Sequence, residues 1–253
     1  MSEHPVTAEG TGAVAAGTGA AVAGTGAAPD GTAVARSPIA PAPPVRVEAG
    51  WEVSGCRSDA PLTIADHTPL AKIHVRAPWN GAMAKALGVP FGRAGREAPG
   101  RDAPGGDASG PDESWLVVGS GPGEWFVFAP PGAAAQASGW LGAMAADSAG
   151  EEFVSVVDLT HGRALVRIAG QDAAELLALL CGADLHDDMA PDGAALRSAV
   201  AGVATDIIRD DRAGVASYLL HCERSSGQYL FDALVSAGES LGIGVDGFRL
   251  PGI

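Results

Sequence analysis

The sequence is poor in aromatic residues and in basic residues. The first shortage limits the composition of the core, and the second excludes some classes of binding partner. Phe, Trp and Tyr together make up only 5% of the 253 residues, so the core must consist mainly of Ala, Val and Leu. The 16 basic residues stand against 30 acidic ones, which gives a formal net charge of -14. Such a surface repels phosphate backbones and anionic lipids, so we expect neither nucleic acid nor membrane as a partner.

Cysteine is scarce and long apolar runs are missing. No stretch reaches the roughly 18 apolar residues of a membrane span, and the N-terminus does not show the basic segment and apolar core of an export signal. The three cysteines, Cys56, Cys181 and Cys222, form no Cys-x-x-Cys pair and lie beside apolar runs. Reduced, buried thiols are typical of cytoplasmic proteins, so we expect a cytoplasmic location.

The first part of the chain has few large apolar residues. Gly-Thr-Gly-Ala recurs there every seven residues, beginning at Gly10. A coiled coil is excluded despite this spacing, because Gly, Ala and Thr bury too little surface to offset the ordering of the backbone. We therefore predict a disordered tail over residues 1–48 and one domain over residues 49–253. Within that domain, residues 92–111 are crowded with Gly, Pro, Arg and Asp, which predicts a flexible surface insertion.

The strongest structural pattern joins two strands and a helix. Phe153–Leu159 and Ala164–Ile168 are rich in β-branched residues, and Thr160-His161-Gly162 between them offers a glycine for a tight reversal with positive φ. This pattern predicts a β-hairpin. A helix follows from Asp172, with Gly182 as its expected left-handed cap.

Further hairpins and helices repeat this arrangement. Because hairpins give antiparallel sheets, we expect the α+β class, with antiparallel β-hairpins and helices packed on the sheet. The remaining predicted elements are a strand over Leu70–Val75, a helix over Gly81–Leu87, a hairpin of Trp115–Val118 and Trp125–Phe128, a helix over Ala133–Ala146, a hairpin of Ala199–Ile208 and Val215–Cys222, and a helix that begins with a capping box of Ser225 and Gln228.

Three segments match chemical motifs by their letters alone. The glycine-rich segment 119–124 is followed by an apolar strand pattern, whereas a dinucleotide loop needs a helix there. Ser240 matches the pattern of a nucleophile elbow, but it ends a predicted helix and no histidine follows it. His186 and its neighbouring aspartates are consecutive residues, which rarely converge on one metal ion. We therefore assign no catalytic, cofactor-binding or metal-binding residue.

A strip of positive charge lies on one face of the second predicted strand. Since strand side chains alternate, Arg163, Leu165 and Arg167 share a face. A face with two arginines is expected to meet solvent or a partner, where it could receive a carboxylate. Simple ion pairing with neighbouring acids is the more common role of such arginines, so it is the favoured alternative. His161 is open to the same two interpretations, as an exposed turn residue or as an acid/base group.

Three motifs connect the chain to a known family. They are GPGEWFVFAP at residues 121–130, VVDLTHGRALVRIAG at residues 156–170 and CERSSGQYLFDAL at residues 222–234. In their order and spacing, residues 56–248 apart from the insertion resemble the gamma subunit of heterotetrameric sarcosine oxidase. That family forms a branch of the superfamily of the glycine-cleavage T-protein, and the resemblance implies a T-protein-like domain.

The resemblance implies a non-catalytic subunit of a flavoenzyme. Such an enzyme oxidatively demethylates sarcosine to glycine, passes the one-carbon unit to tetrahydrofolate and forms hydrogen peroxide. FAD, FMN, NAD and tetrahydrofolate would then be bound by the partner alpha, beta and delta subunits, and this chain would hold no cofactor. An independent folate-binding aminomethyltransferase remains the alternative. Residues that would contact a subunit or ligand are His161, Arg163, Arg167, Arg224, Ser225 and Tyr229.

Overall fold

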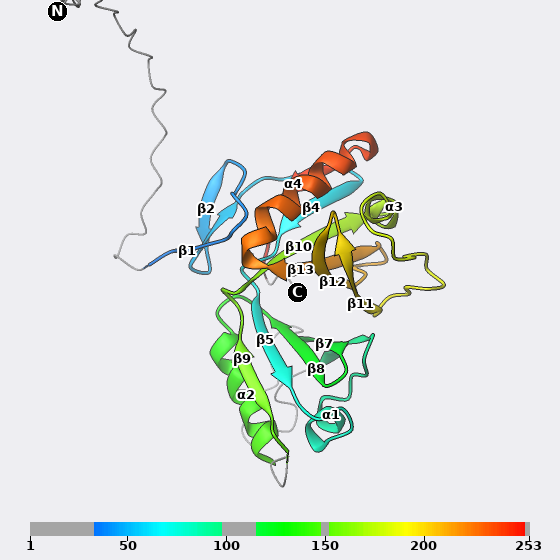
Figure 1. Cartoon of the computed structure of the whole chain (residues 1–253). Coiled ribbons are helices and arrows are strands. Elements are labelled where there is room, and N and C mark those ends of the chain that lie inside the picture. The colour runs from blue at the N-terminus through cyan, green and yellow to red at the C-terminus, as the bar shows by residue number, and fades with distance from the viewer. Residues whose placement is uncertain (1–32, 98–114, 148–151, 251–253) are drawn as a thin grey trace, which may run out of the picture.

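The computed structural model describes residues 33–97, 115–147 and 152–250. Their strands form sheets of three, six and five strands (Figure 1). The three-stranded sheet has the order β1-β3-β2, the six-stranded sheet β11-β12-β13-β10-β4-β14, and the five-stranded sheet β6-β7-β8-β5-β9.

The strands have the following bounds: β1 Ala35–Arg36, β2 Val45–Glu48, β3 Trp51–Ser54, β4 Leu62–Asp66, β5 Ala71–Arg76, β6 Ala94–Glu97, β7 Trp115–Gly121, β8 Glu124–Ala129, β9 Ser155–Asp158, β10 Arg163–Gly170, β11 Ala195–Val200, β12 Val203–Arg209, β13 Ser217–Glu223 and β14 Gly244–Asp246. The helices are α1 Ala82–Leu87, α2 Ala134–Asp147, α3 Ala173–Ala178 and α4 Gly227–Gly238.

The α+β class is confirmed. Among the described strands, all pairs are antiparallel except β1 with β3 and β14 with β4. The helices divide between the two larger sheets, with α3 and α4 on the six-stranded sheet and α1 and α2 on the five-stranded sheet (Figure 1). The predicted strand at Leu70, the helices at Gly81 and Ala133, and the hairpin of β7 and β8 are confirmed to within one to three residues.

The strongest sequence pattern is not a hairpin. Both strands form, but β9 pairs with β5, and β10 pairs with β13 and β4. The turn at Thr160-His161-Gly162 carries the chain from the five-stranded to the six-stranded sheet, and Gly162 does not take a positive φ. Strand composition predicted the strands correctly. Their partners were wrong, because pairing is fixed by the two cores on which the strands pack.

Other local predictions also differ from the structure. The strand expected over Ala199–Ile208 is the end of β11, a turn at Ala201 and Gly202, and most of β12, because both turn residues take positive φ, 49° and 80°. Helix α3 ends before Gly182, which is not its cap. The capping box is wrong too, since α4 begins after Ser226 with no side-chain cap and Gln228 accepts a hydrogen bond from Ala40 N instead.

The predicted tail and insertion are both too long. Residues 33–48 contribute β1 and β2, and Ile39 is only 1% exposed, so the disordered tail cannot extend to residue 48. Strand β6 likewise lies inside the predicted insertion 92–111. Residues 1–32 and 98–111 lie outside the described residues. The composition did not predict these short strands, because the surrounding Pro, Gly and Ala residues interrupt the alternation of apolar and polar residues that indicates a strand.

The core lies on both faces of β10. Its Ala164, Val166 and Ile168 pack with α3 and α4, while Leu165 on the opposite face packs against Phe126 of β8. Leu165 is fully buried, which contributes about 2 kcal/mol of hydrophobic free energy. The face that carries Leu165 therefore looks into the junction of the two larger sheets, and the expectation that it faces solvent or a partner is wrong.

Candidate functional site

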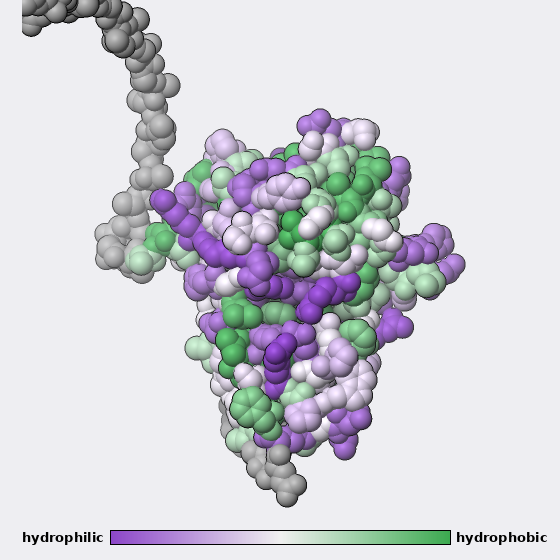
Figure 2. Space-filling model, viewed as in Figure 1, coloured by the Kyte–Doolittle hydropathy of each residue, from purple (hydrophilic) through white to green (hydrophobic). Residues whose placement is uncertain are grey.

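Charged side chains gather where the two larger sheets meet. We call them the polar cluster, and they are His74, Glu124, Arg163, Arg197, Asp206, His221 and Glu223. The cluster joins the sheets directly, since Arg197 Nη1 of β11 lies 3.5 Å from Glu124 Oε2 of β8. Hydrophilic residues form a band across the visible face, between the region of β10 and α4 and the region of β5 and α2 (Figure 2).

Asp206 is the most enclosed carboxylate of the cluster. Arg197 Nε donates to its Oδ1 at 2.8 Å and Arg163 Nη2 donates to its Oδ2 at 3.0 Å. The side chain of Asp206 is only 5% exposed. Burial raises the pKa of this carboxyl, and the two guanidinium groups oppose that rise. Both oxygens are thus occupied by arginine donors, which leaves little capacity to bind a substrate proton.

His221 is fully buried beside Asp206. Its ring lies 4.5 Å from the ring of Phe126, and its Nδ1 lies 3.1 Å from Arg163 Nη2. Burial, and then the charge of Arg163, holds the pKa of His221 well below its usual value, so the ring is neutral. Because Nδ1 accepts from Arg163, Nε2 carries the proton, and it has no hydrogen-bond partner among the described residues.

Glu124 connects the cluster to the five-stranded sheet. Its Oε1 lies 2.9 Å from His74 Nε2. Burial acts to raise the pKa of Glu124, but the hydrogen bond with His74 and the charges of Arg197 and Arg76 hold it below its ordinary value. Every carboxylate of the cluster therefore has a cationic or histidine partner. These paired charges link the two larger sheets.

The predicted contact residues lie in different parts of the fold. Arg163 belongs to the polar cluster, and Arg167 is buried with its Nη2 2.9 Å from Asp210 Oδ2, so ion pairing explains both arginines. Burial lowers the pKa of the Arg167 guanidinium, against the charge of Asp210. His161 is exposed and its ring stacks on Trp51 at 4.8 Å.

The other predicted contact residues lie at the start of α4 and just before it. Arg224 Nη2 donates to Arg36 O at 2.7 Å, which ties the first strand to the end of β13. Ser225 is exposed in the short turn before α4. Tyr229 is 59% exposed and its hydroxyl donates to Ala201 O at 3.2 Å. These residues remain predictions for a subunit or ligand contact.

Sequence reasoning missed Asp206 and His221, although a signal was present. Each is a polar residue inside an apolar strand, in VATDII for Asp206 and YLLHC for His221. Buried charges are rare unless they are paired, so a carboxylate in such a strand predicts an arginine partner. Asp210, which follows the predicted strand Ala199–Ile208, is likewise buried, and it meets three arginines, Arg96, Arg167 and Arg212.

Lys72 is a further buried titratable group, on β5. It is fully buried, and its Nζ donates to Thr68 O and Leu70 O, each at 2.7 Å. Burial lowers the pKa of Lys72 to about 7, and the nearby Asp66 and Asp158 act in the opposite direction. The amine can therefore change its charge near neutral pH.

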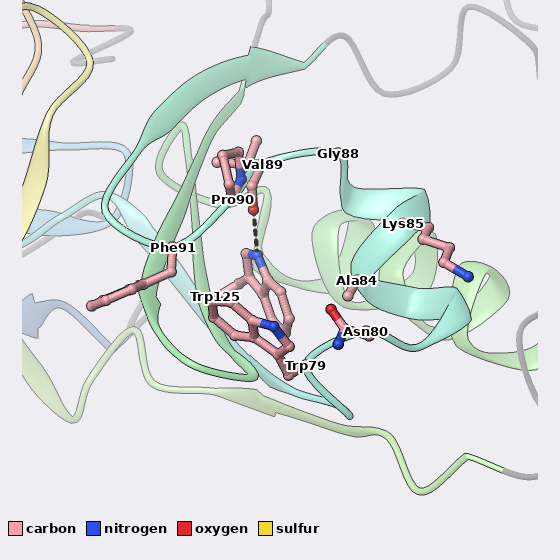
Figure 3. Close-up of a pocket in the computed structure, with 9 residues that line it drawn as sticks. All are labelled: Trp79, Asn80, Ala84, Lys85, Gly88, Val89, Pro90, Phe91 and Trp125. Carbon is pink, nitrogen blue, oxygen red and sulfur yellow. Dashed lines mark hydrogen bonds between the residues drawn. The ribbon is translucent and has the colours of Figure 1, made fainter.

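A pocket lies away from the polar cluster, beside α1. It measures about 400 Å³ and is lined by Trp79, Asn80, Ala84, Lys85, Gly88, Val89, Pro90, Phe91 and Trp125 (Figure 3). None of these residues belongs to the polar cluster. Within the described ranges, no group of His, Cys, Asp and Glu side chains could hold a metal ion. Asp187 near His186 is instead paired with Arg209.

Comparison with solved structures shows the fold. A chain of heterotetrameric sarcosine oxidase from Corynebacterium sp. U-96, in complex with pyrrole 2-carboxylate, has a TM-score of 0.56 at 20% identity, over 75% of this chain and 90% of that one. The glycine cleavage system aminomethyltransferase T from Bartonella henselae has a TM-score of 0.58 at 17% identity, over 82% of this chain. This chain covers only 56% of the Bartonella enzyme.

Three further findings complete the description. No curated protein matches the chain. Among the helices of the described residues, none is long and apolar enough to cross a membrane. The family model of the GCVT N-terminal domain matches residues 113–249, which hold β10, the polar cluster apart from His74, and α4. The chain therefore belongs to the family of the GCVT N-terminal domain.

Proposed function

We propose that this chain is the gamma subunit of a heterotetrameric sarcosine oxidase and has no catalytic role of its own. The main observation in favour of the proposal is the share of each solved chain that this chain covers. The chain aligns over 90% of one chain of a heterotetrameric sarcosine oxidase but over 56% of an aminomethyltransferase. The fold therefore matches the sarcosine oxidase chain more completely than it matches the aminomethyltransferase.

The polar cluster supports the same proposal. Asp206 is saturated by Arg163 and Arg197, and the His221 ring is enclosed between strands and aromatic rings. A general base needs a free lone pair within hydrogen-bond reach of the substrate. In our proposal FAD, FMN, NAD and tetrahydrofolate are bound by the alpha, beta and delta subunits, and this chain holds the assembly together.

The experiment compares the chain alone with the mixture of subunits. We expect the purified chain to show no flavin absorbance and no sarcosine-dependent peroxide formation, whereas the large subunits together with this chain should show both. Turnover of sarcosine by the chain alone would contradict the proposal. The single substitutions Tyr229→Ala and His161→Ala then test whether these exposed side chains contact the partner subunits. Neither residue belongs to the core clusters, so a loss of assembly in either variant would indicate a lost subunit contact.

An independent folate-binding aminomethyltransferase is the second candidate. It is favoured by the match of the family model over residues 113–249 and by the TM-score of 0.58 to the Bartonella aminomethyltransferase. Titration calorimetry of the isolated chain with tetrahydrofolate separates the candidates. A micromolar dissociation constant would favour the transferase, and absence of binding up to millimolar concentration would favour the subunit.

A further inference from the structure

The pocket beside α1 has walls that the backbone holds in place. Helix α1 ends at Gly88, which takes a φ of 66°, and the chain then passes Gly119 of β7. A Cβ on Gly119 would lie 2.3 Å from Pro90 O, so only glycine permits this approach. Trp125 Nε1 donates to Val89 O at 2.8 Å (Figure 3). These contacts fix residues 88–91 before any ligand arrives, which reduces the entropy cost of binding.

Aromatic surface dominates the exposed part of this pocket. Trp79 is 48% exposed and Phe91 is 50% exposed, and their rings meet edge to face at 6.2 Å. Trp125 beneath them is only 3% exposed and lends a rigid floor. The volume of about 400 Å³ falls within the roughly 300–1,000 Å³ of small-molecule sites. A flat, largely apolar ligand would cover the indole of Trp79.

The polar groups of the pocket select for negative charge. Lys85 is the only ionisable residue of the lining, in a protein with a formal net charge of -14. Within the described part of the chain, Lys85 Nζ, the Asn80 amide and Trp79 Nε1 make no hydrogen bond. Asn80 lies between the tryptophan rings and α1, while Lys85 extends from α1 into the open (Figure 3). The donors of Asn80 and Trp79 therefore lie beside an apolar surface that no carboxylate lines, and Lys85 adds a positive charge at its rim.

We propose that this pocket binds a small planar aromatic anion, such as an aromatic carboxylate. The ring lies on the face of the Trp79 indole, the carboxylate accepts from the Asn80 amide, and Lys85 provides a favourable charge at the rim. The site lies apart from the polar cluster and does not depend on the proposed subunit role, because it is made entirely by this chain.

The test uses the five tryptophan indole N–H signals of the full chain in NMR spectra. The probes are 2-naphthoate and, as a matched cation, 2-naphthylmethylammonium. We expect 2-naphthoate to shift the signals of Trp79 and Trp125 saturably and to leave those of Trp51, Trp115 and Trp140 in place. The cation should bind at least about fivefold more weakly, because the lining carries a positive charge and no negative one.

Two pairs of variants make the result specific. Trp79→Ala should weaken 2-naphthoate binding about tenfold, and Phe153→Ala, another exposed aromatic, should not change it. Lys85→Gln should weaken it about two- to fivefold, and Arg249→Gln, which also removes one surface charge, should not. Equal binding of both probes, binding unchanged in Trp79→Ala, or no saturable shift up to several millimolar would overturn the proposal.

Discussion

At the scale of the residue, the charges between the two larger sheets differ from ordinary surface pairs. The Arg163 side chain is 15% exposed and that of Asp206 is 5% exposed, whereas Arg249, paired with Asp246, is 56% exposed. Water screens the surface pair, but it hardly reaches Asp206. Removing one partner of a buried ion pair leaves the other charge buried without a counter-charge. The resulting loss in the free energy of unfolding is larger than the net contribution of the intact pair.

Replacing Arg163 tests this difference. Arg163→Met removes one of the two donors to Asp206, so we expect the free energy of unfolding to fall by about 3 kcal/mol. The control Arg249→Met breaks a surface pair and should cost less than about 1 kcal/mol. Urea unfolding at pH 7 measures both variants. Equal, small effects would show that the polar cluster does not hold the sheets together.

Lys72 gives the molecule a pH dependence. Its pKa is about 7 in the folded chain and 10.5 in the reference state, so the unfolded chain binds more protons between these values. The free energy of unfolding should therefore rise with pH above about 7, by at most about 1.4 kcal/mol per pH unit. Urea unfolding between pH 7 and 8 keeps most cysteine thiols of the unfolded chain protonated, since their reference pKa is about 8.5. In Lys72→Met, the free energy of unfolding should rise less steeply with pH than in the unchanged chain. The same slope in both proteins would contradict the lowered pKa of Lys72.

At the scale of the element, sequence reasoning found strands more reliably than their partners. The β-branched runs at β9 and β10 and the helical spacing of α4 carry local signals, and these elements form. The step from β9 in one sheet to β10 in the other has no local signal, because it depends on which core each strand covers. The polar cluster was hidden for the same reason. Arg163 predicted an acidic partner, but only the register places Asp206, 43 residues away, beside it.

The first three strands show the cost of reading composition alone. Residues 33–48 look like the end of a repetitive tail, yet they bury Ile39 and pair with β3. We expect a chain that lacks residues 1–48 to melt several degrees lower than a chain that lacks residues 1–32, because about 2 kcal/mol of burial at Ile39 is lost together with two strands. Differential scanning calorimetry compares the two truncations. Equal melting temperatures would mean that these strands contribute no stability.

At the scale of the whole molecule, two sheets with their own helices meet through an apolar cluster around Leu165 and through the paired charges of the polar cluster (Figure 1). In the polar cluster, Asp206 is ion-paired with Arg163 and Arg197, so its carboxylate stabilises the fold. We expect such a rigid domain to present a fixed surface to partner subunits. In our account the chain contributes surface to an assembly, and the pocket beside α1 is a separate binding site on it.

The native mass of a co-expressed assembly tests this account most directly. The chain is produced together with the alpha, beta and delta subunits and the mixture is separated by size before native mass spectrometry. We predict one complex that contains one copy of this chain together with the flavin-bearing subunits. A flavin-bearing complex that forms without this chain, while the chain elutes separately as a monomer, would contradict the account.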